Sequence, residues 1–271
     1  MRFRAVISIL LLGIAAAAQT PSTQTSPAQK SLQDIINEDP GAKKARAVLE
    51  QTIQALGGPK YMSVQDMEQE GRTYAFYHGT PSGTGAPYWR MWKWPDKDRY
   101  ELTKQRDVVY IYNGTQGWEV TYKGTRAEDA DELKEYLRAR NYSLENVLRV
   151  WLNQPETALF YDGIGLAQDK QVDKVTLING KNEAVTLYVD QLTHLPVKKS
   201  YQIRDPQTRE LDEEAEVFDN WRPEQGINTP HAITVFHNGE MKRQRFIQSV
   251  TYNQGIPDSK FTATVTYTPK G

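Results

Sequence analysis

The chain of 271 residues contains no cysteine. Without a thiol it forms no disulfide, so burial alone has to hold the fold together. The same absence excludes a lipid-modified cysteine after a signal sequence, a cysteine metal ligand and a cysteine nucleophile. We therefore expect neither a lipid-anchored protein of that kind nor a thiol redox enzyme.

The chain also lacks a charge imbalance and long apolar runs beyond its first residues. It carries 33 basic and 34 acidic residues, whereas nucleic-acid binding calls for a basic face. After the N-terminal segment no run approaches the roughly 20 apolar residues that a membrane-spanning helix needs. We expect no nucleic-acid partner and no stable membrane insertion.

Catalytic and metal-binding motifs are equally scarce. The four histidines are His78, His194, His231 and His237. His231 and His237 would lie about 20 Å apart on one strand face, too far for one metal ion. No HExxH or G-x-S-x-G motif occurs. Glu214 and Glu216 share a strand face at the spacing of glycosidase carboxylates, although a solvated face explains them more simply. We predict no catalytic residue, no metal site and no cofactor.

The N-terminus carries a clear targeting pattern. Arg2 and Arg4 precede an apolar run that ends in Ala16-Ala17-Ala18, a small-residue cleavage signal. The run is shorter than the roughly 20 residues of a membrane span, so we predict a secretory signal peptide over 1–18, cleaved after Ala18. The alternative is an uncleaved anchor. Residues 19–30 are rich in Ser, Thr, Pro and Gln and indicate a disordered tether, followed by one domain over 31–271.

Hydrophobic periodicity predicts an α+β fold. Apolar residues at helical spacing from Ala45 to Leu56 indicate a helix that begins at Pro40-Gly41 and ends at Gly57-Gly58. The period changes to two from Met67 to Lys123, with Asn113-Gly114 as a hairpin turn. Helical spacing returns over 127–153 as a pair of helices, and strands resume from Val172 to Tyr252. We expect about ten or eleven antiparallel strands, preceded by one helix and interrupted by the helical pair.

An antiparallel sheet with one apolar face must cover that face, and three helices are few for so wide a sheet. A curved sheet with few covering helices tends to leave an apolar concavity, which binds apolar ligands; the alternative is a filled core. The candidate ligand-binding residues are Tyr74, Phe76, Trp92, Trp94, Tyr110, Tyr112 and Trp118 on strands and Leu137, Val147, Leu148 and Trp151 on the helical pair. Because the strand parity is open, Trp89 and Met91 are alternatives to Trp92 and Trp94.

Four segments carry a resemblance to a known family: Ala45–Gly58, Tyr188–Ile203, Glu216–Pro230 and Val250–Phe261. They contain an Asp-x-x-Thr-x-x-Pro turn, formed by Asp190, Thr193 and Pro196, and a closing Pro-Asp-x-x-Phe, formed by Pro257, Asp258 and Phe261. With these motifs the chain resembles the LolA/LolB-like periplasmic lipoprotein carriers and their outer membrane lipoprotein-sorting relatives.

The resemblance implies an open β half-barrel with the helical pair as a lid over a cavity that takes acyl chains. It also implies a periplasmic location, where the lack of cysteine fits the soluble carrier. Arg72, Arg90 and Arg99 are all candidates for the polar residue that controls opening.

These observations predict a non-enzymatic periplasmic binder or carrier of a lipid or a lipid-modified protein. The first alternative is a cell-envelope sensor or protein-interaction module on the same fold, with a possible envelope protein as partner. An esterase or glycosidase is the third.

Overall fold

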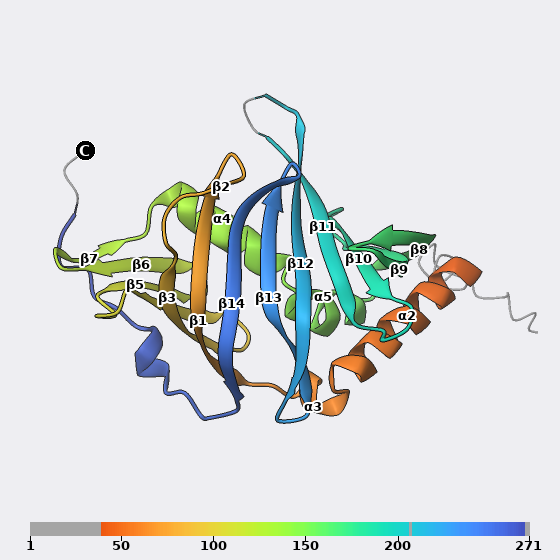
Figure 1. The fold of residues 1–271 in the computed structure, drawn as a ribbon, viewed down its shortest axis with the longest axis horizontal. Helices are drawn as coiled ribbons and strands as arrows, with labels where there is room; N and C mark the ends of the chain where they lie inside the picture. The colour runs from red at the N-terminus through yellow and green to blue at the C-terminus, as the bar shows by residue number, and fades with distance from the viewer. Residues whose placement is uncertain (1–38, 206–207, 269–271) are drawn as a thin grey trace, which may run out of the picture.

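The computed structural model describes residues 39–205 and 208–268, so the predicted signal peptide and the tether over 19–30 lie outside the described residues. The strands are β1 (Asp66–Tyr77), β2 (Thr80–Pro81), β3 (Ala86–Lys93), β4 (Lys97–Leu102), β5 (Val108–Asn113), β6 (Gln116–Thr121), β7 (Gly124–Ala127), β8 (Ala158–Ala167), β9 (Lys170–Ile178), β10 (Ala184–Asp190), β11 (Pro196–Arg204), β12 (Leu211–Glu224), β13 (Ile227–His237) and β14 (Glu240–Tyr252). They form one 14-stranded sheet in the order β7-β6-β5-β4-β3-β1-β14-β13-β12-β11-β10-β9-β8, with β2 paired to β1 (Figure 1).

Every strand pair in the sheet is antiparallel, and β7 and β8 do not pair with each other, so the sheet stays open. The open antiparallel sheet with an N-terminal helix confirms the predicted fold class. The sheet has more strands than the expected ten or eleven. Within the period-two stretch from Met67 to Lys123, no separate strand was expected at the position of β4, because Asp98, Arg99 and Glu101 give it a polar sequence. Strand β8 was missed because it is an edge strand interrupted by Gly163 and Gly165.

The helices are α2 (Pro40–Leu56), α3 (Pro59–Met62), α4 (Ala130–Asn141), α5 (Leu144–Arg149) and the 3₁₀ turns η1 (Trp151–Asn153) and η2 (Asp258–Phe261). Helix α2 begins where the Asp39 carboxylate accepts hydrogen bonds from the amides of Gly41 and Ala42. It ends at Gly57, whose φ of 132° favours glycine. The helix predicted between Pro40-Gly41 and Gly57-Gly58 and the predicted helical pair over 127–153 are therefore both present.

The helices divide the sheet into two faces. Tyr136 of α4 donates a hydrogen bond to Asp98 and stacks on Tyr112 at 3.5 Å between ring centroids. The ammonium of Lys199 donates to the carbonyl of Tyr142, which follows α4. Cross-strand partners share a face, so the register assigns the rest of the sheet. We call the face that α4 and α5 cover the inner face; Figure 1 shows both helices behind the sheet.

Most of the core lies between the inner face and the helices. Leu49 of α2, Val147 and Leu148 of α5 and Leu187 of β10 are all 0% exposed and belong to one apolar cluster. The other face, the outer face, has a smaller core that the C-terminal segment covers. There, Val109 and Ile111 pack against Ile256 and Phe261.

The two motifs of the resemblance are structural elements of this fold. The Asp190 carboxylate accepts hydrogen bonds from the amides of Leu192 and Thr193, which fixes the turn between β10 and β11. Asp258 of the closing motif forms ion pairs of 2.7 Å with Lys93 and Lys97. Side-chain hydrogen bonds from the two lysines lower the pKa of Asp258 to about 2.

Candidate functional site

The inner face changes character along strand β14. Ile247, Val250 and Tyr252 are buried in the main apolar cluster, whereas Arg243 and Arg245 precede them on the same face. A register shift lies within the apolar part, between Ile247 and Ser249, where β1 passes from Gly71 to Glu70. We call the buried part of the inner face the apolar region. We call Arg90 of β3, Arg243 and Arg245 the arginine cluster.

The apolar region is filled by side chains. Val147, Leu148 and Trp151 are only 0, 0 and 2% exposed, and they pack in the main cluster. Tyr142 lies at 5.3 Å from Trp151 between ring centroids and stacks on Tyr201 at 3.9 Å. We expected Val147, Leu148 and Trp151 to belong to a lid over a partly empty cavity. This was wrong, because these side chains are fully packed in the main apolar cluster. Helix α5 and η1 are sealed parts of the core.

The register settles where the predicted aromatic residues lie. Trp92, Tyr110 and Tyr112 are on the inner face, because they pair with Met67, Tyr100 and Asp98 in the register that includes the α4 contacts. Trp89 and Met91 point to the outer face. Trp94 follows β3, and the guanidinium of Arg149 lies 3.8 Å above its ring.

Three of the aromatic residues are not where the sequence placed them. Tyr74 and Phe76 lie on the outer face, where Tyr74 meets Phe246 edge-on at 5.9 Å. Trp118 pairs with Ile111 and packs in the outer core. Their placement on the concave face was wrong because both faces of this part of the sheet carry aromatic residues. Alternation alone then does not tell one face from the other.

Arg90 is tied to a carboxylate and to helix α4. Its guanidinium donates two hydrogen bonds to Asp98, at 3.0 and 2.7 Å, and the Tyr136 hydroxyl donates a third to the same carboxylate at 3.2 Å. Burial opposes the charge of Arg90, but Asp98 outweighs it and raises the pKa of Arg90 well above its ordinary value. Of the three arginines proposed to control opening, only Arg90 faces inward. Arg72 and Arg99 lie on the outer face.

A second ion pair lies on the neighbouring strands. The ammonium of Lys199, whose residue is 2% exposed, donates to Tyr142 O at 2.7 Å and pairs with Glu216 at 3.0 Å. Burial would raise the pKa of Glu216, but Lys199, then Arg245 and Arg243, bring it below its ordinary value. Glu214 bonds His237 at 2.8 Å instead. A glycosidase general acid needs a raised pKa, so Glu216 does not fit that role.

Arg243 and Arg245 have no counter-ion among the described residues within 4.0 Å. Their neighbours in the register are uncharged: Ala75 and Val235 flank Arg243, and Thr73 and Ile233 flank Arg245. The buried Nε of Arg245 has no hydrogen-bond partner in the part of the chain that the structure describes. Sequence reasoning missed both arginines, although the alternation Arg243-Gln244-Arg245 in a strand already places them on one face.

Helix α4 covers this polar part of the inner face without sealing it. No residue of α4 is fully buried, and Leu137 is only half-buried. Polar contacts position the helix instead. They include the Tyr136 hydrogen bond, an ion pair of 3.7 Å between Glu135 and Lys242, and hydrogen bonds from Arg140 to the carbonyls of Asp96 and Gly114.

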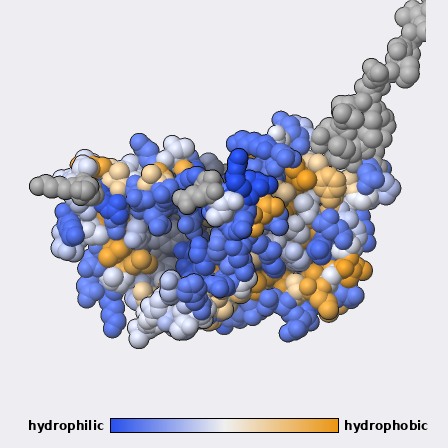
Figure 2. Space-filling view, turned by 90° about the horizontal axis from the view of Figure 1, so that it is seen from above, coloured by the Kyte–Doolittle hydropathy of each residue, from blue (hydrophilic) through white to orange (hydrophobic). Residues whose placement is uncertain are grey.

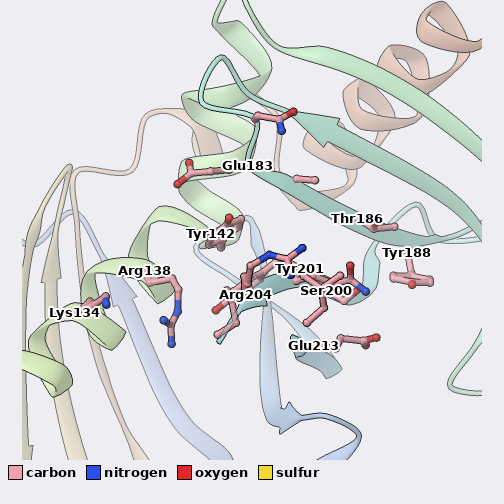
Figure 3. Close-up of a pocket in the computed structure, with 15 residues that line it drawn as sticks. Lys134, Arg138, Tyr142, Glu183, Thr186, Tyr188, Ser200, Tyr201, Arg204 and Glu213 are labelled. Atoms are coloured by element: carbon pink, nitrogen blue, oxygen red, sulfur yellow. The ribbon is translucent and has the colours of Figure 1, made fainter. Parts of the chain in front are cut away.

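A hollow of about 890 Å³ opens beside the C-terminal half of α4 (Figure 3). Arg138 and Tyr142 reach it from the helix side, while Thr186 and Ser200 belong to strands β10 and β11. Most of the side chains in Figure 3 are polar, so the hollow is no apolar ligand pocket. Figure 2 shows a mainly hydrophilic surface on the side where β2 and the β11–β12 connection lie.

Among residues 39–205 and 208–268, no three acidic or histidine side chains come together as a metal site. Over the same residues, no helix is long and apolar enough to cross a membrane.

The fold is similar to that of several solved bacterial proteins. A DUF1329 family protein from Desulfovibrio piger is 12% identical, with 80% of this chain and 97% of that one covered and a TM-score of 0.58. A domain from Vibrio parahaemolyticus described as an outer membrane lipoprotein-sorting protein is 10% identical, covering 81% and 96%, with a TM-score of 0.53. A LolA superfamily protein from Nitrosomonas europaea is 14% identical, covering 81% and 97%, with a TM-score of 0.51.

No family model matches the chain. No curated protein matches it in sequence. At these identities the structural likeness concerns the fold alone, and that fold is LolA-like.

Proposed function

We propose that the protein is a periplasmic, non-enzymatic binder of an amphiphile, either a lipid or the lipid part of a modified protein. The ligand would lie between α4 and the inner face of the sheet. The observation that carries the proposal is that α4 covers a polar part of that face through hydrogen bonds and one ion pair and buries none of its own residues fully. Such a cover can be displaced at far lower cost than α5, whose Val147 and Leu148 are fully buried.

The LolA-like fold supports the proposal, since one of the structural relatives is described as a lipoprotein-sorting protein. The sequence pattern of residues 1–18 supports export. In this proposal the lid is α4 alone, rather than the whole helical pair over 127–153.

The absence of cysteine permits a clean test. Glu135→Cys with Lys242→Cys, joined by a bis-maleimide cross-linker, would fasten α4 to β14 where the two side chains now form an ion pair. We expect the cross-linked protein to take up a fluorescent phospholipid at least tenfold more slowly than the same variant before cross-linking. The matched control is His78→Cys with Glu240→Cys, an exposed pair at 3.5 Å that does not involve α4.

Equal uptake by the cross-linked and free forms would contradict the role of α4. Mass spectrometry of lipids that co-purify with the exported protein would identify the natural ligand class.

The sealed apolar region favours a second candidate, an envelope protein-interaction module. Edge strand β8 supports it, because Phe160, Ile164 and Leu166 are 42, 57 and 80% exposed, and such an edge can pair with another strand. This candidate predicts no phospholipid uptake by either form of the cross-linking variant.

A further inference from the structure

Two arginines of the inner face stand outside its ion pairs. Asp98 is engaged by Arg90, and Glu216 is engaged by Lys199. Arg243 and Arg245 are left over, since no carboxylate of the described residues lies within ion-pair distance of either. Two cations on one strand face, about 7 Å apart along the strand, repel each other in the apo protein.

The surroundings of the two arginines make this arrangement costly. Arg243 is exposed, yet desolvation by nearby protein atoms, followed by the charge of Arg245, lowers the pKa of Arg243. The Nε of Arg245 is buried without an acceptor from residues 39–205 and 208–268, and a buried donor that lacks a partner is destabilising. A bound anion would remove both penalties, because it supplies acceptor oxygens and negative charge.

The residues that flank the two arginines on the neighbouring strands carry no charge that would compete with such an anion. Ala75 and Thr73 on one side and Val235 and Ile233 on the other bear no charge and no long polar side chain. Tyr100 lies close enough on the same face for the two arginines to influence its pKa, and its hydroxyl adds a further donor. Two guanidinium groups and one hydroxyl therefore offer donors to an anion, while Glu216, whose pKa the two arginines help to lower, is held by Lys199 at 3.0 Å.

We propose that Arg243 and Arg245 form a binding site for a phosphate group on the inner face. Guanidinium groups bind phosphate oxygens through paired hydrogen bonds, and a phosphate monoester carries close to the two negative charges that the pair lacks. The inference rests on the proposed function in one respect: the phosphate would belong to the headgroup of the amphiphile beneath α4. Free phosphate shares the same chemistry, so the experiment has to distinguish the two sources.

The test compares two lipids that differ only in the phosphate. Phosphatidic acid and diacylglycerol with the same fluorescent acyl chains are titrated into the protein, and inorganic phosphate is titrated separately by calorimetry. The variant Arg243→Gln with Arg245→Gln removes the two charges. The matched control Lys43→Gln with Lys104→Gln removes two exposed lysines. The pair Arg243→Lys with Arg245→Lys keeps the charges but loses the forked geometry.

We expect phosphatidic acid to bind at least about tenfold more tightly than diacylglycerol, because charge-assisted hydrogen bonds are among the stronger ones. This preference should vanish in the glutamine pair, persist in the control and return in part in the lysine pair. The glutamine pair should melt close to the wild-type temperature, because the lost repulsion between the two cations and their lost attraction to Glu216 offset each other. A lower melting temperature would identify the arginines as structural and overturn the site.

The remaining outcomes separate this inference from the proposed function. Equal binding of the two lipids, unchanged in the glutamine pair, overturns the phosphate site and leaves the lipid binder intact. Binding of inorganic phosphate but of neither lipid, lost in the glutamine pair, keeps the phosphate site and overturns both the headgroup source and the proposed function. Binding of none of the three probes overturns both.

Discussion

The two parts of the inner face, the apolar region and the arginine cluster, are covered by helices in different ways. The apolar region is closed by α5 and η1, whose Val147, Leu148 and Trp151 are almost inaccessible to solvent. The arginine cluster is covered by α4, which buries no residue fully and is held by polar contacts. Apolar burial contributes most of the stability of a fold, whereas exchangeable polar contacts permit opening. The difference indicates that stability is concentrated in one region and ligand binding in the other.

The strongest way to test this division is Trp151→Ala. A large aromatic side chain removed from a packed core costs about 3–5 kcal/mol of unfolding free energy, and Trp151 is only 2% exposed. We expect a loss in this range by denaturant unfolding, with lipid affinity unchanged below the unfolding transition. Tyr122→Ala is the control, because Tyr122 is 89% exposed. A variant that stays stable but loses lipid affinity would show that Trp151 contributes to ligand binding.

A smaller effect is expected at the boundary between the two regions, where Lys199 is buried. Lys199→Met leaves Glu216 without its nearest cation, but Arg243 and Arg245 stay close to it. We therefore expect a loss of about 2 kcal/mol, below the 3–5 kcal/mol typical of a broken buried pair. Lys198→Met is the control: Lys198 lies on the outer face and pairs with the partly exposed Glu213, and its loss should cost less than about 1 kcal/mol.

The pH dependence of the Lys199 variant tests whether Lys199 stabilises the charged form of Glu216. The folded state holds the pKa of Glu216 below its ordinary value. The stabilisation is thus complete above the unfolded pKa of about 4.3 and is lost as the pH falls through the folded pKa. The stability difference between wild type and Lys199→Met should be constant from about pH 7 to 5 and shrink below about pH 4. A difference that grows on acidification would contradict the assignment.

The smallest change should appear at α4. Tyr136→Phe removes the hydroxyl that donates to Asp98 but keeps the ring on Tyr112. We expect about 1 kcal/mol less stability for the helix cover. Amide hydrogen exchange should then be about fivefold faster over 130–141 and unchanged over 144–149. Faster exchange in both helices would mean that α4 and α5 open as one unit, as the sequence first suggested.

The sequence predicted the order of elements well because each depended on local signals. The period-two runs, the Asn113-Gly114 turn and the helical spacing over 45–58 each identify one element without tertiary information. The missed strands show the limit of those signals. Strand β4 carries Asp98 and Glu101, whose charges are compensated by Arg90 and Arg99, and a single sequence does not show such pairing.

The candidate site was predicted less well, since it depends on which face each strand turns inward. Trp92 and Tyr112 lie on the inner face, whereas Tyr74 and Trp118 do not, although all four follow the same alternation. The search also favoured aromatic residues, so the two arginines of β14 were overlooked. Their interest arises because no carboxylate of the described residues lies within 4.0 Å of either and their neighbours on β1 and β13 are uncharged, which a single sequence does not show.

The position of β14 in the sheet bears on how the protein folds. The last strand of the chain pairs with the first, and this pair stands in the middle of the sheet, between β3 and β13. Neighbouring strands on either side come from two separate hairpin series, which can form early because their contacts are local. Joining them requires contacts across most of the chain, so we expect the β1–β14 pairing to be a late and slow step. Until it occurs, both arginines of β14 remain outside any formed site, and the strand edges of both halves stay open to misassembly.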